Sequence, residues 1–142
     1  MRTLGLDLGS KRIGVAVSDP LGFTAQGLAT LRPEGGEQGV IRELRAVIED
    51  KDVKEIVVGL PINMNGTEGP QAKAAIQFAD TLKNEFSMPV KLWDERLSTV
   101  EVEKVMIMGG ASRKKRKNKI DTLAAQVMLQ SYLNSKQNDI RT

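Results

Sequence analysis

Residues 3–19 contain two apolar runs joined by a short turn, and this pattern constrains the fold more than any other feature of the sequence. In residues 4–8, and again in residues 13–17, every second residue is Leu, Ile or Val. Alternation with a period of two is typical of β-strands. Gly9 and Ser10 supply the conformational freedom that a tight turn requires. The stretch therefore predicts two adjacent antiparallel strands.

Asp7 does not fit this apolar pattern, because a carboxylate near the end of an apolar strand is costly unless a partner compensates its charge. Two interpretations are open at this point. Either the carboxylate binds a metal ion or a metal-bound phosphate, or it caps the turn by accepting hydrogen bonds from the backbone amides of Gly9 or Ser10. The stretch by itself favours neither interpretation.

The composition limits the chemistry that is available to the 142 residues. Cysteine and histidine are both absent, which excludes disulfides, thiolate metal sites and catalysis by a histidine-activated nucleophile. The remaining chemistry rests on carboxylates, hydroxyls, lysine, arginine and cations bound by oxygen. A formal net charge of +3 suggests an anionic partner. No signal-peptide profile or membrane-length apolar run is found, so we expect a soluble, cytoplasmic protein.

The rest of the sequence alternates between strand-like and helix-like patterns. A third strand is expected over residues 23–31, and apolar residues then recur at helical spacing over residues 37–50 and 70–86. The other predicted elements are strands over 55–60 and 89–93, a helix from the capping box Ser98–Glu101 to Gly109-Gly110, a basic loop over 111–119 and a final helix over 120–133.

This order of elements predicts an α/β fold. Strands joined by short turns run antiparallel, whereas strands joined through a helix run parallel by right-handed crossovers. The expected result is a mixed five-stranded sheet, with three antiparallel strands followed by parallel strands, flanked by helices on both faces. We expect residues 1–142 to form a single domain in which residues 134–142 are a flexible tail.

Acidic residues from separate segments are predicted to meet at one edge of this sheet. Ligands of open α/β sheets bind at the carboxyl ends of the parallel strands. Asp7 lies at the end of the first strand, Asp94 and Glu95 follow the fifth, and Asp121 at the start of the final helix can reach the same edge. Carboxylates gathered without histidine suit Mg²⁺ or Mn²⁺. Two such ions stabilise the attacking and leaving oxygens of a phosphodiester.

Each of these residues also has a purely structural explanation. Asp121 suits the N-terminus of a helix because of the helix dipole. Glu95 can pair with Arg96 or Lys91 on the surface, and the basic run at 113–117 can be a solvated loop. Because three acids from separate segments are predicted at one edge, we favour the metal site.

Four segments of the chain, in this order, resemble one known family. They are GLDLGSKRIGVAVSD at 5–19, VVGLPINMNGTEGPQA at 57–72, WDERLSTVEVE at 93–103 and KNKIDTLAAQVMLQSYL at 117–133. Together they are similar to the YqgF (RuvX) family, whose members are described as Holliday-junction-resolvase-like proteins or as candidate pre-16S ribosomal RNA nucleases. That family has the ribonuclease-H-like fold, which agrees with the strand order predicted above.

The resemblance implies that Asp7, Glu95 and Asp121 are metal-binding catalytic acids, with Asp94 as a further candidate ligand. It implies a nuclease that uses Mg²⁺ or Mn²⁺ and processes the 5′ end of pre-16S ribosomal RNA, or alternatively a resolvase of branched DNA. The nucleic-acid contacts are expected from Lys11, Arg12, Asn65, Gly66, Thr67, Arg96, Arg113, Lys114, Lys115, Arg116, Lys117 and Lys119. The simpler interpretation of Asn65-Gly66 is a tight turn.

Two functions of other classes remain possible from the sequence. Asp7, Gly9 and Gly14 resemble the phosphate loop of the actin, sugar-kinase and Hsp70 superfamily, but those proteins enclose a nucleotide between two such domains. The second alternative is a non-catalytic RNA-binding factor for ribosome assembly that keeps the acids for structural reasons. For the oligomeric state we expect a monomer or a weak homodimer.

Overall fold

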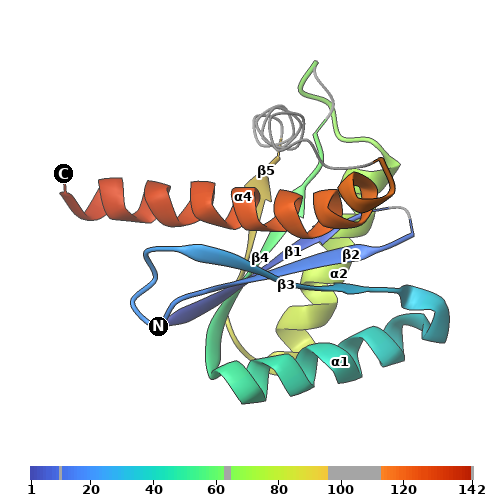
Figure 1. The fold of residues 1–142 in the computed structure, drawn as a ribbon, viewed down its shortest axis with the longest axis horizontal. Helices are drawn as coiled ribbons and strands as arrows, with labels where there is room; N and C mark the ends of the chain where they lie inside the picture. The colour runs from blue at the N-terminus through green and yellow to red at the C-terminus, as the bar shows by residue number, and fades with distance from the viewer. Residues whose placement is uncertain (10, 63–64, 96–112, 142) are drawn as a thin grey trace.

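A mixed five-stranded sheet forms the centre of the structure, a computed structural model that describes residues 1–9, 11–62, 65–95 and 113–141. The strands lie in the order β3-β2-β1-β4-β5 (Figure 1). β1 pairs with β2 and β2 with β3 in antiparallel fashion, whereas β1 with β4 and β4 with β5 are parallel. Their bounds are Arg2–Leu8 for β1, Ile13–Ser18 for β2, Ala25–Leu31 for β3, Val53–Leu60 for β4 and Val90–Asp94 for β5. The predicted sheet is therefore confirmed.

Helices cover both faces of this sheet, as the sequence predicted. Figure 1 shows α4 along one face, with α1 and α2 on the other. Their bounds are Gly36–Lys51 for α1, Pro70–Phe86 for α2 and Arg113–Arg141 for α4, and a short 3₁₀ helix, η1, covers Pro33–Gly35. The helix predicted over residues 98–110 lies outside the described residues. None of the described helices is both long and apolar enough to cross a membrane.

Alternation along β1 sends its side chains into two separate cores. Leu4 and Leu6 are fully buried in the core that also contains Leu44 of α1. Gly5 lies between them and faces α4, where an added Cβ would come within 3.0 Å of the Leu129 Cβ. By the same alternation Asp7 lies on the α4 face. The glycine at position 5 thus allows α4 to pack closely against the strand that carries Asp7.

The extent of α4 corrects two predictions. Residues 113–119, which we expected in a basic loop, form its first turns, and the helix continues past Leu133 to Arg141. Lysine and arginine are favourable helix formers, and no glycine or proline interrupts this segment. Asp121 therefore lies inside the helix rather than at its N-terminus, where the helix dipole acts most strongly.

Candidate active site

Asp7 and Glu95 meet at the carboxyl edge of the parallel strands, where the sequence predicted a site. β1 carries Asp7 near its end, and the chain leaves β5 at Asp94 directly before Glu95. The backbone N–H of Glu95 donates to the carbonyl of Leu60 at 3.2 Å, which fixes the chain as it leaves the sheet. The side chain of Glu95 is hydrogen-bonded to that of Asp7. Residues 88 positions apart in the sequence thus form an acid pair.

Glycines beside Asp7 make room for this pair. Asp7 lies opposite Gly14 of β2, and on its other side β4 carries Gly59, which pairs with Trp93 of β5. The side chain of Glu95 lies directly over Gly59, where an added Cβ would collide with its carboxylate. Sequence reasoning missed Gly59, although a glycine inside an otherwise apolar strand often marks a close approach of this kind.

The Glu95 carboxyl is held in its protonated form by its surroundings. Burial raises the pKa of Glu95 to about 10, and the hydrogen bond to Asp7 and the charges of Asp7 and Asp94 act in the same direction. At neutral pH the pair therefore keeps a proton between two carboxyl groups. A divalent cation would replace that proton and compensate the negative charge of both carboxylates. The donor set therefore fits Mg²⁺ or Mn²⁺.

The structure assembles only part of the predicted ligand set. Among the side chains that it describes, no group of three or more acids lies close enough to hold a metal ion. The side chain of Asp121 is not among them, but its neighbour Thr122 lies 3.0 Å from Thr30, oxygen to oxygen. Thr30 pairs with Gly14, which pairs in turn with Asp7. Position 121 of α4 thus lies at about the same level of the sheet as Asp7.

The predicted turn residues have mixed outcomes. The amide of Gly9 donates to the carbonyl of Arg12 at 2.7 Å, so this amide is not capped by Asp7. In the loop after β4, Asn65 Oδ1 accepts hydrogen bonds from the Thr67 amide at 3.1 Å and its hydroxyl at 2.6 Å. Gly66 has a φ of 85° there, so this segment forms the tight turn of the simpler interpretation.

Only some of the basic side chains predicted to contact nucleic acid are among the described residues. Lys11 is exposed beside the candidate site, as a phosphate contact requires. Arg96 and Ser10 lie outside the described residues, and the side chains of residues 113–119 are likewise not described. Their proposed roles in nucleic-acid binding therefore stay predictions.

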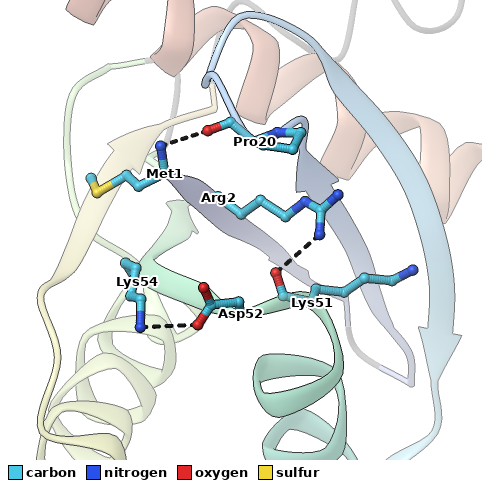
Figure 2. A pocket seen from close by; sticks show the side chains of 6 residues that line it. All are labelled: Met1, Arg2, Pro20, Lys51, Asp52 and Lys54. Carbon is cyan, nitrogen blue, oxygen red and sulfur yellow. Dashed lines mark hydrogen bonds and ion pairs between the residues drawn. The ribbon is translucent and has the colours of Figure 1, made fainter.

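A shallow cavity of about 220 Å³ lies at the opposite edge of the sheet, at the start of β1 (Figure 2). Its lining residues are Met1, Arg2, Pro20, Lys51, Asp52 and Lys54. Arg2 donates to the carbonyl of Lys51 at 3.2 Å, and Lys54 lies 2.9 Å from Asp52. Figure 2 shows the side chains of Lys51 and Lys54 pointing in different directions. The cavity contains none of the predicted site acids, and its cationic groups do not converge on one point.

The proton on the acid pair predicts how stability depends on pH. The folded chain without metal binds a proton at Glu95 that the unfolded chain releases above its usual pKa of 4.5. This contribution to stability is therefore complete below pH 4.5 and is lost as pH rises towards the folded pKa of about 10. Glu95→Gln cannot titrate, so we expect its melting temperature in chelator to fall less than that of the wild type between about pH 6 and pH 9.

Thermal unfolding of both proteins, with and without Mn²⁺, measures this difference. Mn²⁺ is expected to flatten the wild-type profile, because the cation takes the place of the proton. Parallel profiles for the wild type and Glu95→Gln in chelator would show that the pair does not hold the proton.

The sheet order and strand directions define a ribonuclease-H-like α/β protein with an acid pair at the carboxyl edge. The chain belongs to the RuvX family, whose family model, described as Holliday junction resolvase, matches residues 1–135. A relative from Geobacillus sp. (strain WCH70) is 58% identical over 139 residues, covering 96% of this chain and 100% of the relative. One from Clostridium acetobutylicum is 50% identical over 135 residues, covering 95% and 99%. Both carry the name "Putative pre-16S rRNA nuclease".

Solved structures of resolvases share the fold. The structure of T. thermophilus RuvC in complex with Holliday junction substrate matches with a TM-score of 0.57 at 18% identity, over 96% of both chains. The fowlpox virus Holliday junction resolvase matches with a TM-score of 0.58 at 14% identity, over 96% of this chain and 99% of the other. These likenesses confirm the ribonuclease-H-like fold that the sequence predicted.

Proposed function

We propose that this chain is a divalent-metal-dependent endonuclease that hydrolyses phosphodiester bonds in the 5′ region of precursor 16S ribosomal RNA. The observation that carries this proposal is the carboxyl pair of Asp7 and Glu95, half-buried at the edge of a ribonuclease-H-like sheet. The choice of RNA is supported by relatives at 50% identity or more that are named for pre-16S rRNA.

The acid pair differs from a structural ion pair in what surrounds it. Glu55, another buried acid, has the cationic Lys136 within 3.3 Å of its carboxylate. Among the described residues, the charged groups that act on Glu95 are instead Asp7 and Asp94, and both raise its pKa. A site that concentrates negative charge in this way is unfavourable by itself and favours a cation.

The residues of this chain would share the work of holding the metal. Asp7 and Glu95 are the first ligands, and Asp94 and Asp121 are the candidates for further coordination. A bound divalent cation supplies charge that activates water and stabilises the charged oxygens of a phosphodiester. The backbone of β1 fixes Asp7, the Leu60 carbonyl fixes the backbone of Glu95, and Gly59 leaves space for its side chain. A second ion would call on Asp94 or Asp121 as well, because each Mg²⁺ is usually held by one or two carboxylates together with water and substrate oxygens.

Substrate recognition would depend mainly on the phosphate backbone. Lys11 and Arg12 lie in the turn that follows Asp7, and α4 begins with a run of lysine and arginine. The sequence contains one tryptophan, one tyrosine and three phenylalanines, which is few for stacking on unpaired bases. We therefore expect affinity for RNA to fall steeply with salt.

A cleavage assay with three substrates tests the proposal. They are a precursor 16S rRNA fragment, an unrelated single-stranded RNA of the same length and a four-way DNA junction, each with Mg²⁺, Mn²⁺ or chelator. The proposal predicts metal-dependent cutting of the precursor fragment in preference to the other two. Cutting of the junction alone would establish the resolvase alternative. RNA binding without any cutting would favour the non-catalytic assembly factor.

A further inference from the structure

Glu55 is a charged side chain near the start of β4, and it is buried with 4% of the side chain exposed. A carboxylate at this depth is costly unless charged or polar groups compensate it. The hydroxyl of Tyr132 donates to Glu55 Oε1 at 2.5 Å, and Lys136 Nζ lies 3.3 Å from Oε2. Both partners come from α4. This cluster of Glu55, Tyr132 and Lys136 is thus a polar anchor between the helix and the sheet.

The same tyrosine also contacts the strand that leads to the candidate site. Its ring packs edge-on against Trp93 of β5, with 5.5 Å between the ring centroids. Trp93 is followed directly by Asp94 and Glu95. The Nζ of Lys136 lies over the ring of Tyr132, 5.4 Å from its centre. Tyr132 therefore touches β4 and β5 at once, and both strands border the acid pair.

The position of Tyr132 along α4 relates it to Asp121. Eleven residues separate positions 121 and 132, which is about three helical turns, or about 16 Å. The two positions therefore lie on nearly the same face of the helix. Towards its start, α4 contacts the edge strand β3 on the same face of the sheet, through Thr122 and Thr30. A shift of α4 along its axis would move position 121 relative to Asp7 by the same amount.

Apolar packing by itself does little to prevent α4 from shifting along its axis. Met128, Leu129 and Leu133 bury α4 against Ala16 and Val57, but hydrophobic contacts are not directional. Hydrogen bonds to a carboxylate are directional and short, and they fix one arrangement of their partners. Burial, the hydrogen bond and the charge of Glu55 raise the pKa of Tyr132, so the hydroxyl keeps its proton and can donate. A buried ionic cluster adds little net stability over apolar packing, so its contribution here is sought in the arrangement that its hydrogen bonds select.

We propose that Glu55, Tyr132 and Lys136 are positioning residues that set the place of α4 along the sheet, and through it the place of Asp121 relative to Asp7 and Glu95. This inference rests on the proposed function, because it takes Asp121 as a ligand of the metal. Residues that hydrogen-bond directly to metal ligands typically change metal affinity by about 10- to 100-fold when they are removed, so a residue that acts over three helical turns should cost no more than the lower figure.

The test is a double-mutant cycle read by Mn²⁺ binding in calorimetry, with RNA absent. Tyr132→Phe keeps the ring against Trp93 and removes only the hydroxyl, and we expect about tenfold weaker Mn²⁺ binding. In the background of Asp121→Asn the same change is expected to have little further effect, because the hydroxyl acts through Asp121. Equal losses in both backgrounds would overturn the inference.

Two further variants separate positioning from loss of stability. Glu55→Gln keeps an acceptor for the Tyr132 hydroxyl, so it should retain more Mn²⁺ affinity than Glu55→Leu. Ile48→Val removes a methylene from the core on the opposite face of the sheet and serves as the control for a lowered melting temperature. If Ile48→Val weakens Mn²⁺ binding as much as Tyr132→Phe does, the cluster is only structural and the inference is wrong.

The outcomes also distinguish this inference from the proposed function. If Asp7→Asn abolishes Mn²⁺ binding while Asp121→Asn binds Mn²⁺ as tightly as the wild type, the metal site stands and the role of the cluster is overturned. If Asp7→Asn binds Mn²⁺ like the wild type, the proposed site itself is wrong, and the positioning inference fails with it.

Discussion

Asp7→Asn is expected to slow metal-dependent cleavage of precursor rRNA by more than about a hundredfold. Removal of a residue that only orients a metal ligand already lowers metal affinity or activity by about 10- to 100-fold. Asp7 is itself a proposed ligand, paired with Glu95, so its loss should cost more. The asparagine side chain has nearly the same shape, and it keeps an oxygen for the Glu95 carboxyl. The fold is therefore expected to remain. Rates measured at saturating RNA over a range of Mn²⁺ concentrations give the size of the effect.

Asp80→Asn provides the matched control, since Asp80 is an exposed acid on α2. The same change of charge there should leave the cleavage rate within about twofold of the wild type, because Asp80 lies outside the candidate site and an exposed substitution of this kind has little effect on stability. Equal activity of Asp7→Asn and the wild type would mean that the acid pair is not the nuclease site.

Gly59→Ala is the second change with a large expected effect. Its Cβ would occupy the space that the Glu95 carboxylate now fills, so the side chain has to swing away from Asp7. The displaced atoms are the end of a flexible side chain, so we expect the protein to fold while Mn²⁺ affinity falls by at least about tenfold. Calorimetry with Mn²⁺ and a thermal melt of the same sample measure the two effects separately.

Gly39→Ala is the control for this substitution. Gly39 lies in α1, and an added Cβ there meets no other atom within 4 Å. Alanine in a helix is more favourable than glycine by up to about 1 kcal/mol, so this variant should melt higher and bind Mn²⁺ normally. If Gly59→Ala binds Mn²⁺ as tightly as Gly39→Ala, Glu95 does not need its present position to hold the metal.

The sheet was predictable because its signals are local. Alternation in residues 4–8 and 13–17 and the unbroken apolar run at 56–58 specify strands. The helical spacing of α1 and α2 specifies the crossovers, so the strands that they join run parallel, and the right-handed connection sets the side of the sheet on which each helix lies. The meeting of Asp7 with Glu95 followed from this topology alone.

The features that were missed depend on contacts between distant residues or on competing local signals. The basic run after residue 112 has the charge pattern of a solvated loop, but its residues are also good helix formers, and the helix prevails. Glu55 has the sequence pattern of a surface residue of a strand, and only the packing of α4 shows that it is buried. Its partner Tyr132 is 77 residues away, so no local pattern predicts the pair.

Glu55 and Glu95, one buried and one half-buried on the α4 face, differ as a structural carboxylate differs from a candidate functional one. Glu55 is compensated by Lys136 and by the Tyr132 hydroxyl. Glu95, over Gly59, is instead paired with a second acid. The first arrangement is complete as it stands, whereas the second requires a proton or a cation.

A crystal structure with Mn²⁺, located by its anomalous scattering, tests the central claim most directly. We predict an anomalous peak between the carboxylates of Asp7 and Glu95, at oxygen distances of about 2.0–2.2 Å, with Asp121 as a further ligand. The peak should disappear in Asp7→Asn. A protein that cleaves RNA with Mn²⁺ but binds the ion elsewhere, leaving Asp7 and Glu95 in contact with each other, would contradict the account.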